Sequence, residues 1–171
     1  FRDLRRLPLA GSRDRMQSLG ELLDQTRSQV PLVIELKSLW DGSDALARRA
    51  LRVLEPYPGP YALMSFDPDL LEALRQISPL TVRGIVADRV TDPYYAALPL
   101  TRRLDLRHMG HLPRSCPHFV SYQYDALPFD PVRMMRAHGM PVLSWTIRDA
   151  AEAARARRYS DQITFEGFRP A

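Results

Sequence analysis

A carboxylate and an amine stand two residues apart in the segment 31–37, Pro-Leu-Val-Ile-Glu-Leu-Lys, which otherwise has the composition of a buried strand. Side chains two positions apart share one face of a strand, so Glu35 and Lys37 are expected to point the same way. Because burying a charge without a partner is costly, this pair should either face solvent or serve a ligand. The amine could also act as an electrophile or form a Schiff base with a carbonyl substrate.

Lys37 is the only lysine among the 24 Lys and Arg residues of the chain. Arginine supplies every other basic side chain, and the two residue types differ in more than their charge. Lysine offers a compact ammonium on a flexible stem, whereas arginine offers a planar fork of donors. The single lysine therefore indicates a position that requires a compact amine.

Composition narrows the classes of function. With 171 residues and 45% hydrophobic content, the chain can build one core and fits a single domain over 1–171. It has no apolar run of about 18 residues, so no transmembrane segment is expected. One cysteine, Cys116, excludes an internal disulfide and a cysteine-based metal site. The net charge is +4, but 20 acidic residues are interspersed and no basic stripe stands out, so nucleic acid is not expected as a partner.

The elements that must position Glu35 and Lys37 alternate between strands and helices, at roughly 25–35 residues per unit. A capping box at Ser18, a cap at Ser43 and Asp-Pro pairs at 67–68 and 130–131 mark helix starts. The expected strands span 32–37, 61–65, 82–86, 119–121, 141–145 and 162–164. The expected helices span 18–29, 44–54, 93–98, 130–138 and 149–158, and one more begins at 67. The stretch 88–117 is otherwise hard to interpret.

This alternation predicts an α/β fold with a parallel sheet, either a barrel or a doubly wound sheet. No glycine-rich fingerprint follows any expected strand, so the sequence does not support a dinucleotide or P-loop site. Polar and aromatic residues instead lie at the carboxyl ends of the strands, where a (β/α) barrel builds its active site. The sequence therefore predicts a (β/α)8 barrel of the TIM type. The residues at these ends are Glu35, Lys37, Ser65, Phe66, Trp145, Thr146 and Thr164.

Three motifs occur in one order along the chain: the segment 31–37, Met-Ser-Phe-Asp at 64–67 and Val-Leu-Ser-Trp-Thr-Ile-Arg at 142–148. Together they resemble the glycerophosphodiester phosphodiesterase family. The resemblance covers essentially the whole chain, but only the later two-thirds of the family's barrel. It implies metal-dependent hydrolysis of glycerophosphodiesters to glycerol 3-phosphate and an alcohol.

The resemblance also implies roles for four residues. Glu35 matches a glutamate that binds the divalent metal, Mg²⁺ or Ca²⁺, and a hard carboxylate oxygen suits such an ion. Lys37 matches a catalytic lysine near the phosphate, where a point charge can stabilise the anionic diester and its transition state. Trp145 matches a tryptophan on the glycerol side of the substrate, and Phe66 matches an aromatic residue that lines the pocket.

The chain also departs from the family pattern. Arg148 stands where the family usually has asparagine, and Phe165 stands where it has an acidic residue. The family's His-Arg-Gly, Glu-x-Asp and His-Asp motifs precede the region that this chain matches. The four histidines of the chain lie in no such motif; they are His108, His111, His118 and His138. A typical barrel needs about 250 residues. We therefore expect an incomplete barrel that lacks its first strands, and an isolated chain that is inactive.

Two alternatives remain open at this point. The first is a non-catalytic module that binds glycerophosphoryl head groups in a pocket derived from the same barrel. The second is another (β/α) enzyme that acts on a phosphorylated metabolite through Lys37. In every case the sheet would have unpaired edges, which favour association with a second copy or with an amino-terminal segment. Residues 1–6 lack the layout of a signal peptide, and the compartment stays open, with the cytoplasm favoured over secretion.

Overall fold

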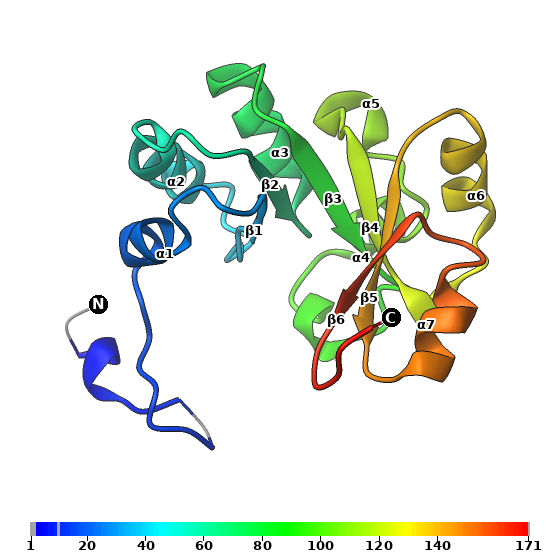
Figure 1. Cartoon of the computed structure of the whole chain (residues 1–171). Helices are drawn as coiled ribbons and strands as arrows, with labels where there is room; N and C mark the ends of the chain where they lie inside the picture. Colours follow the sequence, from blue (N-terminus) through cyan, green and yellow to red (C-terminus); the bar gives the residue numbers. More distant parts are fainter. Residues whose placement is uncertain (1–2, 10, 171) are drawn as a thin grey trace.

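The computed structural model describes residues 3–9 and 11–170 of the chain, so Phe1 and Arg2 of the amino-terminal stretch lie outside the described residues. Within the described ranges, six parallel strands form one sheet in chain order. They are β1 (Leu32–Glu35), β2 (Tyr61–Ser65), β3 (Arg83–Ala87), β4 (Phe119–Gln123), β5 (Val142–Ile147) and β6 (Gln162–Phe165). Figure 1 shows a curved sheet with helices on its outer side, a half-barrel. The predicted α/β class and parallel sheet are confirmed.

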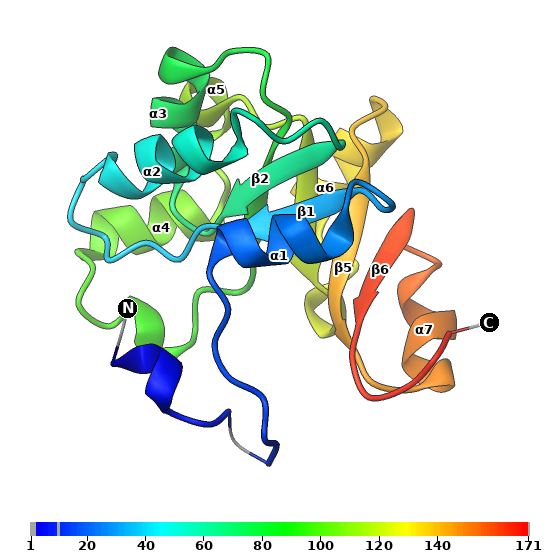
Figure 2. The same cartoon turned by 60° about the vertical axis from the view of Figure 1, so that its left-hand side comes forward.

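The helices are α1 (Leu19–Thr26), α2 (Ala45–Leu54), α3 (Pro68–Ile77), α4 (Leu100–Arg107), α5 (Leu112–Ser115), α6 (Asp130–Ala137) and α7 (Ala150–Ala156). The short 3-10 turns are η1 (Leu4–Arg6), η2 (Pro93–Tyr95) and η3 (Tyr124–Ala126). Figure 2 shows α1 beside β1 at one edge of the sheet and α7 beside β6 at the other. Over the part of the chain described, no helix has both the length and the apolar character needed to cross a bilayer.

The two faces of the sheet differ in burial. Leu63, Ile85, Val120 and Val142 are all 0% exposed and belong to the core clusters that join the sheet to the helices. Alternate residues of a strand point to opposite faces, so the inner face carries the residues between them. Val33 of β1 lies on this inner face and is 49% exposed. The outer face therefore holds the core, while the inner face remains partly open at β1.

Three expected helix caps are confirmed. Ser18 forms the predicted capping box, because its side chain accepts from the Glu21 N–H while the Glu21 side chain accepts from the Ser18 N–H. The Asp67 side chain caps α3 by accepting from the Asp69 N–H, and the Asp149 side chain caps α7 in the same manner. These caps fix where each helix leaves the end of its strand.

Two expected caps were wrong. The residue before α2 is Asp44, and Ser43 lies one position further out, where its Oγ accepts from the Ala45 N–H at 3.3 Å. Asp130 is the first residue of α6 and Phe129 precedes it. The Asp130 carboxylate forms an ion pair with Arg133 at 3.1 Å, on the same helix, so it complements the helix amino terminus without capping it.

The stretch 88–117 contains structure that the sequence did not reveal. The helix expected over 93–98 is only the 3-10 turn η2, and the helices α4 and α5 were not predicted. Helix α4 is rich in charge and α5 contains a proline in its first turn, so neither has a clear apolar stripe. Ion pairs from Arg102 and Arg114 to α3 hold these helices in place. Tertiary contacts therefore decide their conformation.

The first strand is shorter than the sequence predicted. Strand β1 ends at Glu35, and Lys37 lies in the loop that follows. The Leu36 N–H still donates to the Met64 carbonyl oxygen at 2.7 Å, but the Leu36 carbonyl accepts from the Ser65 hydroxyl, also at 2.7 Å. The side chain of the last residue of β2 thus takes the place of a backbone partner, and the chain turns away from the sheet.

Candidate active site

The carboxyl ends of β1, β2 and β5 bring together the four residues that the sequence singled out. Glu35 is the last residue of β1, Phe66 follows β2 directly, and Trp145 lies in β5. The Lys37 Nζ atom lies 2.7 Å from Glu35 Oε1 and 5.6 Å from the centre of the Phe66 ring. The ring centres of Phe66 and Trp145 are 5.6 Å apart. The four side chains therefore form one group at one end of the sheet.

The Glu35–Lys37 pair faces solvent on the side of the amine. The Lys37 side chain is 73% exposed, whereas that of Glu35 is 23% exposed. The Glu35 Oε1 atom is itself buried and accepts no hydrogen bond of suitable geometry, although the Lys37 ammonium is close. The contact is thus an ion pair without hydrogen-bond alignment. It leaves this carboxylate oxygen with lone pairs that a ligand could use.

A divalent metal would find only part of a site in these residues. Hard cations take six or more oxygen ligands, several of them carboxylates. Across residues 3–9 and 11–170, no group of three or more His, Cys, Asp or Glu side chains is arranged to hold a metal ion. The buried Oε1 atom of Glu35 fits the role of one ligand. The described residues do not complete the coordination of a metal.

An aromatic cluster covers the same end of the sheet, and it is larger than the sequence suggested. The Trp40 ring centre lies 5.7 Å from that of Tyr94 and 6.0 Å from that of Tyr95. Phe66 lies 6.2 and 6.5 Å from the same two tyrosines. Edge-on and tilted contacts of this kind are the favoured aromatic geometry. The cluster consists of Trp40, Phe66, Tyr94, Tyr95 and Trp145.

Trp40, Tyr94 and Tyr95 were not among the predicted site residues. A usable signal existed, because each lies in a loop that follows a strand carboxyl end, where barrel sites are built. Tyr95 is 3% exposed, and its hydroxyl donates to Asp88 Oδ2 at 3.0 Å. Burial raises the pKa of the Asp88 carboxyl and also that of Tyr95. This tyrosine–carboxyl pair anchors the loop after β3 beside the aromatic cluster.

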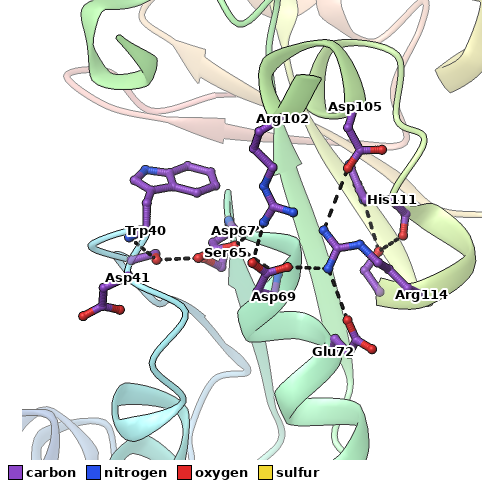
Figure 3. Close-up of polar contacts among 12 residues, drawn as sticks. Trp40, Asp41, Ser65, Asp67, Asp69, Glu72, Arg102, Asp105, His111 and Arg114 are labelled. Carbon is purple, nitrogen blue, oxygen red and sulfur yellow. Dashed lines mark hydrogen bonds and ion pairs between the residues drawn. The ribbon is translucent and has the colours of Figure 1, made fainter. Parts of the chain in front are cut away.

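A network of charged residues lies behind the site, among α3, α4 and α5 (Figure 3). Arg102 of α4 contacts Asp67 at 3.0 Å and Asp69 at 2.8 Å. Arg114 of α5 contacts Asp69, and it also contacts Glu72 at 3.2 Å. The two arginines lower the pKa of the Asp69 carboxyl against the opposing effect of burial. The network fixes α4 and α5 to the first turns of α3.

The histidines make their hydrogen bonds away from the aromatic cluster. His111 is 1% exposed and its Nδ1 lies 3.2 Å from the Ser115 hydroxyl within α5. His118 Nδ1 accepts from the Arg83 N–H at the start of β3, and His138 contacts the Met134 carbonyl at the end of α6. His108 is exposed at the end of α4. None of these contacts involves Glu35 or Lys37.

The two departures from the family pattern have ordinary partners. Arg148 forms an ion pair with Glu166 at 2.7 Å, and both side chains are more than half exposed. The Phe165 ring contacts the Phe168 ring with centres 5.7 Å apart. Trp145 is fixed differently, because its indole N–H donates to the Ser121 carbonyl at 3.1 Å. The orientation of Trp145 therefore depends on the neighbouring strand β4.

Comparison with known proteins bears on the fold. No protein-family model matches the sequence, and no curated protein sequence matches it. Solved structures do match. A glycerophosphodiester phosphodiesterase from Parabacteroides distasonis aligns over 96% of this chain with a TM-score of 0.71 and 18% identity. A phosphodiesterase from Oleispira antarctica in complex with the product sn-glycerol-3-phosphate aligns over 90% with a TM-score of 0.70 and 16% identity.

A third structure, a glycerophosphodiester phosphodiesterase from Thermotoga maritima, aligns over 88% of this chain with a TM-score of 0.62 and 18% identity. The chain spans 66% of the Parabacteroides protein, 58% of the Oleispira protein and 60% of the Thermotoga protein. The chain therefore corresponds to about two-thirds or less of the length of each of these proteins. The chain shares, over that portion, the fold of the glycerophosphodiester phosphodiesterases, the family that its three motifs resemble.

Proposed function

We propose that this chain is an incomplete (β/α)8 barrel and a portion of a metal-dependent glycerophosphodiester phosphodiesterase. The observation that carries the proposal is the position of Glu35, Lys37, Phe66 and Trp145. All four lie at the carboxyl end of a parallel sheet whose fold is similar to that of proteins bearing this activity in their names. A barrel builds its active site at this end.

The reaction adds water to phosphorus and breaks the bond from phosphorus to the alcohol oxygen, so that glycerol 3-phosphate and an alcohol leave. The exposed Lys37 ammonium would bind the anionic phosphoryl oxygens, while Phe66 and Trp145 would pack against the glycerol carbons. Glu35 would contribute one ligand to Mg²⁺ or Ca²⁺. A bound divalent ion would supply Lewis acidity toward the phosphoryl oxygens.

Among the described residues, no histidine lies at the site to transfer protons. The leaving alcohol must receive a proton and the attacking water must lose one, tasks that histidine often performs. The histidines of this chain bind elsewhere, as the contacts of His111, His118 and His138 indicate. We therefore propose that the 171 residues bind the product but do not release it from a diester.

Titration with sn-glycerol 3-phosphate in the presence of Mg²⁺ or Ca²⁺ tests this proposal. Calorimetry on the whole chain should detect binding, and Lys37→Ala should weaken it by about tenfold or more, because a hydrogen bond to a charged group is lost. Arg49→Ala removes an exposed cation on α2 and serves as the matched control. Equal affinities for the two variants would overturn the role of Lys37.

Glu35→Gln separates the metal from the phosphate. The amide keeps the shape of the side chain but replaces the charged carboxylate with a neutral carbonyl, which binds a divalent cation more weakly. We expect the variant to bind sn-glycerol 3-phosphate with the same affinity whether or not Mg²⁺ or Ca²⁺ is added. If the divalent ion strengthens binding equally in the variant and the parent chain, Glu35 is not a metal ligand.

A binding module is the second candidate, and the histidine contacts favour it. A chain whose described histidines all lie away from its site can bind glycerophosphoryl head groups without hydrolysing them. Incubation with glycerophosphocholine and each metal tests whether the chain by itself hydrolyses a diester. Binding without release of choline agrees with both the module and the isolated portion of an enzyme. Metal-dependent release of choline by the chain itself would exclude the module.

A further inference from the structure

The loop after β1 carries Lys37 and Trp40, and the turn between β2 and α3 holds it by side-chain hydrogen bonds. The Ser38 hydroxyl donates to Asp67 Oδ2 at 2.5 Å and accepts from the Trp40 N–H at 2.8 Å. Figure 3 shows Trp40, Ser65 and Asp67 in this arrangement, with Arg102 approaching from the other side. Lys37 is therefore followed directly by a residue whose side chain is bonded to Asp67.

Asp67 is suited to this task because its own orientation is fixed. It is 2% exposed, and its N–H donates to the Ser65 hydroxyl at 3.1 Å. Its Oδ1 atom accepts from the Asp69 N–H and from Arg102, both at 3.0 Å. Its Oδ2 atom accepts from Ser38. One oxygen thus caps α3 and binds α4, while the other is reserved for the loop.

The backbone conformation of Trp40 shows why the loop needs these hydrogen bonds. Its φ angle is 58°, in the left-handed region that bulky residues rarely adopt without support from the surrounding structure. The loop gains a further contact from the Tyr94 hydroxyl, which donates to the Ser38 carbonyl at 3.3 Å. The indole of Trp40 contacts both Tyr94 and Tyr95. These contacts provide the support that a left-handed backbone at a bulky residue needs.

We propose that Asp67, acting through Ser38, is a positioning residue that fixes Lys37 and Trp40 at the candidate active site. A simpler explanation is that Asp67 serves only as the cap of α3. The two explanations can be separated because they use different oxygens. Ser38→Ala removes the bond to Oδ2 and leaves the bonds from Asp69 and Arg102 to Oδ1 intact. The consequence for ligand binding rests on the proposed function, whereas the hold on the loop does not.

The first test needs no ligand. Trp40 and Trp145 are the two tryptophans of the chain, so Trp145→Phe leaves Trp40 as the only indole. In that background, Ser38→Ala should increase the quenching of Trp40 fluorescence by acrylamide and shift its emission to longer wavelength. Ser38→Thr, which keeps the hydroxyl, should restore both values. Ser43→Ala is the matched control, because Ser43 lies in the same loop but its hydroxyl accepts from the Ala45 N–H and makes no contact with Asp67. Quenching equal in Ser38→Ala and Ser43→Ala would overturn the proposal.

The second test measures binding of sn-glycerol 3-phosphate with Mg²⁺ by calorimetry, in the chain with both tryptophans. Ser38→Ala should weaken the affinity by about tenfold, and Ser38→Thr should recover most of it. If Ser38→Ala increases the quenching but leaves the affinity unchanged, ligand binding does not depend on the Ser38–Asp67 hydrogen bond. The positioning role of Asp67 would then be wrong. If the parent chain itself does not bind, the proposed function fails, and the quenching result alone decides whether Asp67 holds the loop.

Discussion

At the scale of single residues, the candidate site depends more on position than on stability. The Lys37 side chain is 73% exposed, and its ion pair with Glu35 is not aligned as a hydrogen bond. Exposed ion pairs contribute only about 0–1 kcal/mol to the free energy of unfolding. Ligand binding, in contrast, can use the full charge of the ammonium because a bound phosphate excludes solvent around it. Stability and binding should therefore respond very differently to the same substitution.

Lys37→Ala provides the first prediction. We expect the free energy of unfolding to change by less than about 1 kcal/mol, because the pair is exposed. Urea unfolding followed by circular dichroism measures this change, with Arg49→Ala as the comparison. A loss several times larger would mean that Lys37 is a structural residue, and the binding defect of the variant could then not be assigned to the site.

His111 provides a prediction about pH. Burial lowers its pKa from the ordinary 6.5 to about 4, against the attraction of Asp105 and with a further lowering by Arg114 and Arg102. Between these two values the unfolded chain binds more protons than the folded chain, so stability must fall as the pH falls from 6.5 towards 4. The difference corresponds to about 3 kcal/mol of unfolding free energy.

The measurement is urea unfolding at several pH values between 7 and 4. His111→Asn should remove most of the contribution of this residue to the slope within that window, although the loss of packing will lower its stability at all pH values. His108→Asn, which alters an exposed histidine at the end of α4, is the comparison variant. An unchanged slope in His111→Asn would mean that other groups, such as the carboxylates around Arg114, cause the acid sensitivity.

At the scale of elements, close packing between neighbouring strands limits which side chains fit. Gly84 of β3 faces Phe119 of β4, and a Cβ at position 84 would collide with the Phe119 ring. Phe119 is 7% exposed and has little room to move. Gly84 is therefore required by the approach of β3 to β4, and not by its own backbone conformation.

Gly84→Ala should destabilise the chain by about 1–3 kcal/mol, the usual cost of overpacking in a core. Gly20→Ala is the opposite control, because Gly20 lies in α1 with only the Ser18 hydroxyl at 4.0 Å from the added carbon. Alanine in a helix is favoured over glycine by about 1 kcal/mol, so this variant should be more stable than the parent. Thermal unfolding measures the melting temperature of both variants. A Gly84→Ala variant that melts no lower than the parent chain would contradict the packing argument.

At the scale of the whole molecule, the sheet has open edges. Within the described residues, β1 pairs only with β2 and β6 pairs only with β5. Unpaired strand edges offer backbone donors and acceptors to other chains. Two exposed apolar residues increase this tendency, since Val33 of β1 is 49% exposed and Phe165 of β6 is 46% exposed.

We predict that the chain associates with itself through these edges. Light scattering combined with size exclusion should give a mass that rises with concentration. Val33→Lys places a charge on the inner face of β1 and should shift the chain towards the monomer. Leu80→Lys is the control, because Leu80 lies in a turn and is 94% exposed, and it should leave the association unchanged. A monomer at all concentrations in the parent chain would contradict this prediction.

Local sequence signals identified most of the elements. The strand at 61–65 was predicted with its observed boundaries, and the capping box at Ser18 placed the start of α1 correctly. The strand expected over 32–37 ended two residues early, since the Leu36 carbonyl binds Ser65 from a different element. Caps and strand alternation depend on residues close in sequence, so the chain alone reveals them. A strand end that depends on a distant side chain cannot be found in the same way.

The residues of the candidate site also fall into those that the local sequence indicates and those that only distant contacts bring to the site. The sequence by itself determined that Glu35, Lys37, Phe66 and Trp145 would lie at strand carboxyl ends, because parallel strands all direct those ends to one edge of the sheet. Only the tertiary structure decided that Trp40, Tyr94 and Tyr95 join them, and that Asp67 holds the loop through Ser38. Those contacts join loops that follow different strands, and their geometry depends on how helices α3 and α4 pack together. Such packing is the sum of many weak contacts between distant residues, which no local pattern in a single sequence encodes.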